Sequence, residues 1–382
     1  MRKTDIDIRR RIADLIRQVV LLAAMVVALL SCGSGGSDEP GTPTPGTSTP
    51  TPIVFSAQQP EDTQITRAAT PLQDLDIKTF KVWANKSMNY VNGTYSGEQT
   101  VISDCTVNYI ENSAGTSTTN THGWEYVNQQ PEDSPEQSIK YWDWSAKAYR
   151  FFGVTQAKVQ DAIAWTENSP SFSATVDATT QAGIDAAPYF SHLWFSNGNT
   201  TQNQKPFGKV VQLEFLKPFA RVRFIFVTGN PEMSVADLYL TNAKFRPASA
   251  SDGQKTIAVK GTFTVTYPAS GSAEEWSVSA TNDDKIEALT HDYYETPNDA
   301  GARYWYTLLP AKNQDTYKLS LSVSGEDKPC YVPAKFMEWL PGFSYTYIFK
   351  VSEEGGVEFG GVYTAYTDWM TGKEVDYSIY NW

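Results

Sequence analysis

Hydrophobic and polar residues alternate through residues 373–382, which read KEVDYSIYNW. Val375, Tyr377 and Ile379 alternate with Asp376 and Ser378, so an extended conformation gives this segment one apolar face and one mostly polar face. The pattern predicts a half-buried strand. Such a strand can return to its own sheet or add to the open edge of another molecule. The pattern alone favours the first alternative, a hairpin within the chain.

The same two-residue period recurs through most of the sequence from residue 77 onward. Short helices are expected only at 155–165 and 283–289. Many short strands separated by Gly and Pro indicate β-sandwiches rather than βαβ units, so we expect an all-β chain. The predicted strands are 77–84, 100–110, 123–128, 209–215, 220–228, 238–245, 261–267, 276–280, 303–309, 316–324, 343–351 and 362–370.

The length of 382 residues exceeds what one hydrophobic core usually supports. Two sandwich domains are therefore expected, at 68–205 and 206–352, with the polar stretch 197–205 between them. Residues 353–382 lie beyond the last strand that the second sandwich needs, and we expect them to form a C-terminal appendage.

The N-terminal residues 1–31 have the organisation of a secretory signal peptide. Six basic residues precede the apolar run 19–30, which is too short to span a bilayer comfortably. The run ends in LLSC, which resembles the bacterial lipobox, so Cys32 is expected to become a lipidated N-terminus that anchors the chain through its acyl groups. Residues 33–52 are rich in Gly, Ser, Thr and Pro and predict a flexible tether.

A short apolar segment, IVFSA at 53–57, follows the tether and precedes the sequence ITRA at 65–68. Arg67 lies in a polar, exposed stretch, where a protease could cleave between Arg67 and Ala68. Residues 32–67 are thus a candidate removable segment that contains one short strand.

Charge and reactive residues argue against nucleic-acid binding and catalysis. The formal charge is −12, which repels phosphate backbones. His122, His192 and His291 are isolated, no GxSxG stretch occurs, and adjacent carboxylates such as Asp283 and Asp284 are expected to be solvated. Cys105 and Cys330 lack metal-ligand spacing and are expected to be buried. We expect no enzymatic activity, no metal and no cofactor.

Several stretches together resemble the fimbrillins of Bacteroidales, the FimA and Mfa-like type V pilins. The order of these stretches along the chain carries the resemblance, since each alone is unspecific. They are the lipobox at Cys32, IVFSA before ITRA, YWD at 141–143 before YRFF, FLKPFARVRFIFV at 215–227, WLPG at 339–342 before YTY, and TDW at 367–369.

The resemblance implies two transthyretin-like β-sandwiches and export as an outer-membrane lipoprotein, followed by cleavage between Arg67 and Ala68 by an arginine-specific protease. Loss of the strand at 53–57 then opens a groove. A neighbouring pilin subunit fills it with a strand from residues 362–382, in which Val375, Tyr377 and Ile379 face the groove, and an extracellular fimbrium grows. The appendage implies a stalk or anchor subunit and reverses the preference for a self-folded hairpin.

A surface carbohydrate-binding lipoprotein of a glycan-uptake system is the main alternative. Trp142, Trp144 and Trp305 could stack on sugars if their rings are exposed. We expect these rings to fill cores or to cover domain ends instead. The segment at 53–57 is expected to stay docked in its own groove until cleavage, because an open sheet edge invites wrong pairing.

Overall fold

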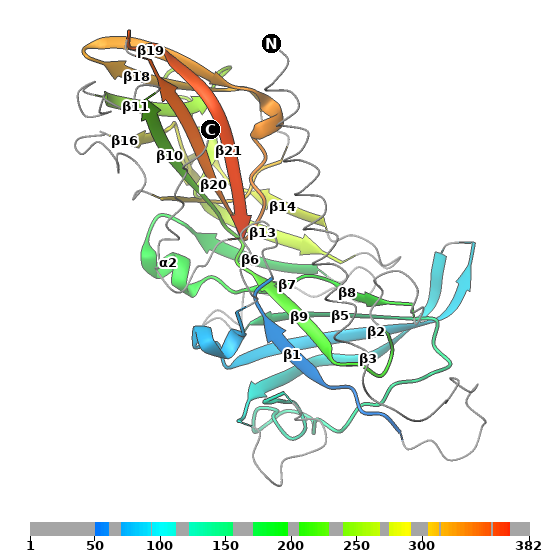
Figure 1. Ribbon diagram of the computed structural model, residues 1–382. Coiled ribbons are helices and arrows are strands. Elements are labelled where there is room, and N and C mark those ends of the chain that lie inside the picture. The colour runs from blue at the N-terminus through cyan, green and yellow to red at the C-terminus, as the bar shows by residue number, and fades with distance from the viewer. Residues whose placement is uncertain are drawn as a thin grey trace, which may run out of the picture. The chain divides into compact units, whose positions relative to one another are not determined.

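The computed structural model describes a chain whose regular elements are nearly all strands (Figure 1). This agrees with the all-β prediction. No helix among the described residues is long and apolar enough to cross a membrane. The described residues are 50–60, 70–92, 94–111, 122–155, 171–197, 206–228, 240–267, 275–291, 305–312, 315–352 and 354–366.

The largest sheet has the order β1-β9-β7-β5-β2-β3-β4, with β8 also paired to β5. Its pairs are antiparallel except for β1 with β9, which run parallel. The strands are β1 (Phe55–Gln58), β2 (Thr79–Val91), β3 (Thr94–Tyr109), β4 (Trp124–Glu125), β5 (Ala148–Thr155), β7 (Phe190–Ser191), β8 (Trp194–Ser196) and β9 (Val211–Leu216).

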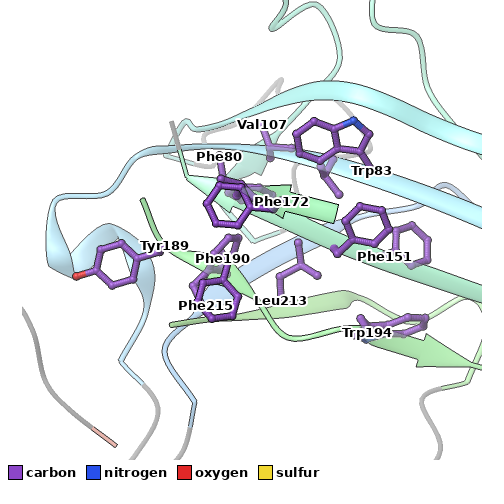
Figure 2. Close-up of a cluster of buried hydrophobic side chains, with 14 of the residues drawn as sticks. Phe80, Trp83, Val107, Phe151, Phe172, Tyr189, Phe190, Trp194, Leu213 and Phe215 are labelled. Atoms are coloured by element: carbon purple, nitrogen blue, oxygen red, sulfur yellow. The ribbon is translucent and has the colours of Figure 1, made fainter. Parts of the chain in front are cut away.

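A three-stranded sheet, β14-β13-β6, contributes to the same hydrophobic core. Its strands are β6 (Ser171–Asp177), β13 (Lys260–Thr266) and β14 (Glu275–Ser279). Phe172 and Phe263 are buried in one cluster with Phe80 and Phe215 (Figure 2). The Tyr267 hydroxyl donates to the Ser191 carbonyl at 2.7 Å, which connects this sheet to β7. The helix α2 (Gln181–Ala186) begins at Thr180, whose side chain accepts a hydrogen bond from the Gly183 amide.

Two further four-stranded sheets, β17-β10-β20-β21 and β16-β11-β18-β19, enclose a second core. In that core Trp339 Nε1 donates to the Tyr347 hydroxyl at 3.0 Å, and this hydroxyl donates to the Phe336 carbonyl at 2.8 Å, so both buried polar groups are paired. The strands are β10 (Ala220–Thr228), β11 (Leu240–Pro247), β16 (Leu289–His291), β17 (Tyr306–Leu308), β18 (Tyr317–Val323), β19 (Glu326–Val332), β20 (Phe343–Val351) and β21 (Val357–Tyr366).

Short elements complete the described structure. Strands β12 (Ile257–Ala258) and β15 (Lys285–Ile286) pair with each other. The single turns of 3-10 helix are η1 (Leu72–Leu75), η4 (Asn282–Asp284) and η5 (Ala334–Phe336). The helix expected at 283–289 is only η4, with a capping box between Thr281 and Asp284, and β15 follows at once. Except for Thr155, which ends β5, the helix expected at 155–165 lies outside the described residues.

Strands from beyond the expected boundary at 205/206 belong to the first core. Strand β9 begins after this boundary, yet it pairs with β1 and β7. Strand β13 also follows it and packs into the first core. The two-residue period locates a strand but does not identify its partner, and sandwich connections are often non-sequential. The structure therefore locates the strands, and the domain limits at 68–205 and 206–352 remain a prediction.

Strand β21 also changes the expected start of the appendage. It pairs antiparallel with β20 from Val357 to Tyr366, and Phe359 and Val362 pack against the second core. The predicted strand at 362–370 therefore starts at least five residues earlier and its first half lies in the chain's own sheet. Residues 367–382 lie outside the described residues.

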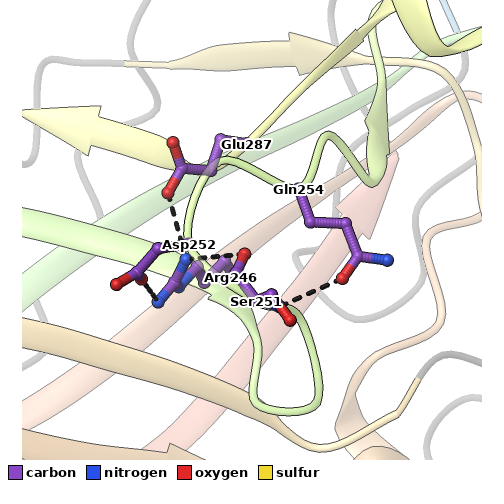
Figure 3. Close-up of polar contacts among 5 residues, drawn as sticks. All are labelled: Arg246, Ser251, Asp252, Gln254 and Glu287. Carbon is purple, nitrogen blue, oxygen red and sulfur yellow. Dashed lines mark hydrogen bonds and ion pairs between the residues drawn. The ribbon is translucent and has the colours of Figure 1, made fainter.

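Arg246 of β11 fixes the loop that follows its strand (Figure 3). Its Nη1 donates to Glu287 Oε1 at 3.0 Å and to the Ser251 carbonyl at 3.2 Å, and its Nη2 contacts Asp252. The Ser251 amide donates to Gln254 Oε1 at 3.0 Å. The guanidinium lowers the pKa of Asp252.

Arg246→Gln is expected to loosen this loop without unfolding the protein. Amide hydrogen exchange at 249–254 should accelerate severalfold, while the unfolding midpoint changes little, because exposed ion pairs contribute little to stability. The exposed Asp327→Asn substitution on β19 serves as the control. Unchanged exchange in the loop would show that Arg246 does not hold it.

Candidate strand-exchange site

Strand β1 and the residues around it fill the edge of the largest sheet with alternating inward side chains. Ile53, Phe55 and Ala57 have exposed fractions of 0%, 0% and 4%. Val54 and Ser56 between them are half-buried. The segment is docked within its own chain, as we expected for the uncut protein, and its alternation is typical of a strand with one buried face.

Strand β9 forms one wall of the site. Phe55 is paired with Val211 and Ala57 with Leu213 in a parallel register. The Val211 amide donates to the Val54 carbonyl at 2.9 Å. Val211 and Leu213 are themselves fully buried, so the inward side chains of β1 extend a continuous apolar face of the sheet.

The opposite wall touches the segment at its two ends. At the first end, the Ile53 amide donates to the Lys140 carbonyl at 2.8 Å and the Trp142 amide donates to the Thr51 carbonyl at 3.0 Å. At the other end, the Gln59 amide donates to the Thr70 carbonyl at 2.8 Å. Residues 51–59 therefore lie in a slot with hydrogen-bonding backbone on both sides.

The centre of the slot is aromatic. The Phe55 ring meets Phe80, Tyr126 and Phe151 edge to face, with centroid separations of 6.4, 5.6 and 6.0 Å. The Tyr126 hydroxyl donates to the Ile53 carbonyl at 3.2 Å and accepts from the Lys140 amide at 2.9 Å. Burial raises the pKa of Tyr126, so the hydroxyl stays neutral and bridges β1 to the 140–142 wall.

Asp143 directly follows the 140–142 wall and stabilises it through hydrogen bonds. Its carboxylate accepts from Lys86 Nζ at 2.5 Å and from the Ser145 amide and hydroxyl at 2.9 and 2.6 Å. The Asp143 amide donates to the Tyr149 hydroxyl at 2.7 Å. The hydrogen bond from Lys86, together with those from Ser145, lowers the pKa of Asp143 to about 2.

We expect the Asp143 carboxylate to make the free energy of unfolding depend on pH in the acidic range. The pKa of Asp143 is lower in the folded chain than its ordinary value of 3.8, so its contribution is complete above about pH 5 and is lost as the pH falls from about 4 to 2. The stability difference between wild type and Asp143→Asn, measured by urea unfolding at several pH values, should therefore shrink over that range. The exposed Asp133→Asn variant should show no such trend, and a pH-independent difference for Asp143→Asn would contradict the assignment.

The tryptophans singled out from the sequence have different environments. Trp142 is buried and stacks on Phe207 with a centroid separation of 5.6 Å. Trp144 is 60% exposed, and its ring lies over Gly208, where φ is +77° and an added Cβ would approach the ring to 2.9 Å. Trp305 is half-buried and packs against the Arg223 guanidinium at 4.5 Å. Trp142 fills a core, which is one of the two expected roles, and Trp144 lies outside both described cores.

The other candidate groups that the structure describes lie in the following environments. Cys105 and Cys330 are buried, and burial raises their pKa values to about 12 and about 11. Asp283 is exposed. The part of the chain that the structure describes contains no cluster of three or more potential metal ligands.

All six predicted site residues lie outside the described ranges. These are Cys32, Arg67, Ala68, Val375, Tyr377 and Ile379. The structure therefore shows the strand that is predicted to be removed, but neither the predicted cleavage site nor the predicted donor. Sequence reasoning missed the walls at 140–142 and 70–71, and it missed β9 as the partner of β1. The only sequence feature that pointed to these contacts was the aromatic cluster in YWD, and aromatic residues do not show which backbone segments pair.

The similar solved structures are described as fimbrial, as cell-adhesion and as polysaccharide-binding proteins. No protein-family model and no curated protein matches the sequence. Similar solved structures include a fimbrial protein from Bacteroides vulgatus, with 12% identity, coverage of 81% of this chain and 98% of that chain, and a TM-score of 0.41.

Two further similar structures have related descriptions. A fimbrial assembly protein from Parabacteroides distasonis has 10% identity, coverage of 79% and 92%, and a TM-score of 0.31. The fimbrial anchor protein Mfa2 from Porphyromonas gingivalis has 9% identity, coverage of 83% and 97%, and a TM-score of 0.29. These neighbours are the kind of protein that the sequence resembles.

Proposed function

We propose that this chain is a structural fimbrial subunit of the stalk or anchor type that polymerises by strand exchange. One observation carries the proposal: Ile53, Phe55 and Ala57 are buried at a sheet edge, and Arg67 lies shortly after this segment in the sequence. A single cut after Arg67 would leave β1 bound only by noncovalent contacts.

The energetic consequence of losing β1 is large. Burial of Ile53 and Phe55 contributes roughly 1.5–3 kcal/mol each, and the backbone hydrogen bonds add to this. The whole stability of a domain is about 5–15 kcal/mol. An empty slot is therefore a serious defect, and binding of a replacement strand is strongly favoured.

The replacement that the sequence offers is the alternating segment with Val375, Tyr377 and Ile379. It has an aromatic residue between two aliphatic ones, as the slot requires around Phe55. In our proposal residues 367–382 of one subunit fill the slot of the next. Strand β21 ends at Tyr366, so the tail starts at the end of an edge strand.

The proposal includes the route to the cell surface. The precursor is exported with its signal peptide, lipidated at Cys32, held at the outer membrane, and cleaved between Arg67 and Ala68 by an arginine-specific protease. The partners are then other pilin subunits, and no catalytic function is proposed.

Cleavage of the purified precursor tests the proposal. Limited digestion with an arginine-specific protease should remove residues 1–67 and produce ladders that resist SDS without heating. The Arg67→Gln variant, treated identically, should stay monomeric. A precursor that loses residues 1–67 completely and yet remains monomeric at high concentration would contradict strand exchange.

Carbohydrate binding remains the second candidate because of Trp144. Its ring is supported from below by Gly208 and is 60% exposed, which suits stacking on a sugar. Glycan binding by the uncut monomer that is lost in Trp144→Ala, without ladder formation after cleavage, would favour this function over polymerisation.

A further inference from the structure

We infer that the donor tail enters the slot in the direction opposite to β1, with Ile379 at the position of Ile53, Tyr377 at that of Phe55 and Val375 at that of Ala57. This inference rests on the proposed strand exchange and adds its direction and register. It follows from the unequal sizes of the three inward positions of the slot.

The two possible directions differ at the ends of the slot and not at its centre. Tyr377 replaces Phe55 in both. In the same direction as β1, Val375 would underfill the position of Ile53, and Ile379 would replace the small side chain of Ala57. In the reverse direction, isoleucine replaces isoleucine, and Ala57 is replaced by the smaller of the two aliphatic residues.

The position of Ala57 has little space for a larger side chain. Ala57 is 4% exposed and lies opposite Leu213, which is fully buried. The next residue, Gln58, forms a bridge with Pro71, and β1 contacts the following turn η1, whose Leu72 is fully buried. Packed interiors resist added volume, so this end of the slot favours valine over isoleucine.

Backbone pairing with β9 also favours the reverse direction, whereas the bridges Pro52–Tyr141 and Gln58–Pro71 are antiparallel and would become parallel. Strand β1 is the one parallel neighbour in the described part of the largest sheet, and parallel pairs are slightly less stable than antiparallel ones. A reversed donor would pair antiparallel with β9. The reverse direction places Glu374 opposite Glu214 on the half-exposed outer face, but repulsion between exposed charges is weak compared with overpacking of a buried position.

Disulfide trapping between subunits distinguishes the directions. Gln58 is paired with Glu214 of β9, so Glu214 faces donor residue 374 in the reverse direction and residue 380 in the same direction as β1. Opposite residues on neighbouring strands are close enough for a disulfide. The native Cys105 and Cys330 are buried, and Cys32 leaves with residues 1–67.

We expect E214C/E374C protein, cut after Arg67 and mildly oxidised, to give ladders that survive boiling and collapse on reduction. E214C/Y380C should form ladders that boiling dissociates. Trapping of the 380 pair, equal trapping of both pairs, or trapping of neither while ladders form would overturn the inferred direction and leave strand exchange intact. Absence of any ladder from the cut wild-type protein would refute both.

Tail truncations give a second test that does not disturb the receiving domain. Ile379→Ala should leave a cavity at the Ile53 position and slow polymerisation or weaken ladders by at least about tenfold. Val375→Ala restores the residue that β1 carries at position 57, and polymerisation should change by less than about threefold. The opposite ranking of the two variants would overturn the inferred direction.

Discussion

Replacement of Phe55 by alanine is expected to lower the free energy of unfolding of the uncut protein by about 3–5 kcal/mol. The ring is fully buried and contacts three other aromatic rings at the centre of the first core. The slot is held by hydrogen bonds on both sides, so it cannot collapse around the cavity that the substitution leaves. Urea unfolding followed by circular dichroism measures this change.

Ser56→Ala is the matched control for this prediction. Ser56 lies in the same strand, is half-buried and faces away from the core, so its replacement should change stability by less than about 0.5 kcal/mol. If Phe55→Ala were no more destabilising than Ser56→Ala, β1 would not be an integral part of the core, and loss of it could not drive assembly.

The proposed exchange requires that β1 be both integral to the core and removable. The strand has four residues and pairs along its length with β9 alone, while the opposite wall holds only its ends. While the chain is intact, the effective concentration of β1 at the slot is high, so β1 rebinds after it dissociates. Cleavage at Arg67 would remove that tether without breaking any described contact. A competing tail can then take the slot.

The sequence predicted many of the strands that have one apolar face, although β6 was missed despite its alternation of Phe172, Ala174 and Val176 with polar residues. Val222, Phe224 and Phe226 alternate with Arg221, Arg223 and Ile225, and β10 has the bounds predicted from this pattern. Strand β19 was missed, because its sequence EDKPCYV is charged and contains Pro329. It is an edge strand of its sheet, a position that tolerates proline.

The candidate site was predictable only in part, for a physical reason. The buried face of β1 follows from the alternation in IVFSA. Its partner does not, because Val211, Leu213 and Phe215 of β9 would show the same alternation in any sheet with one buried face. The long-range pairing of Phe55 with Val211 depends on which strands meet across the whole core, and local patterns contain no information about that.

Deletion of residues 367–382 is expected to abolish polymerisation of the cleaved protein while leaving its fold intact. In the proposed exchange these residues fill the slot of the next subunit and not a site in their own subunit, and they follow β21, which ends at Tyr366. Light scattering after size-exclusion chromatography should give a monomer for the cleaved deletion variant and polymers for the cleaved wild type. The far-ultraviolet circular dichroism spectra of the uncut deletion variant and the uncut wild type should be the same.

Substitutions within the tail test whether its apolar face, and not only its presence, is needed for polymerisation. The variant V375S/Y377S/I379S should behave like the deletion, because burial of these residues supplies most of the gain in free energy. The control D376N/S378A alters the outer face and should polymerise normally. Since the tailless protein keeps its slot, it should accept one donor and shorten polymers when mixed with cleaved wild type. Full-length polymers from the tailless protein alone would show that the donor lies elsewhere in the chain.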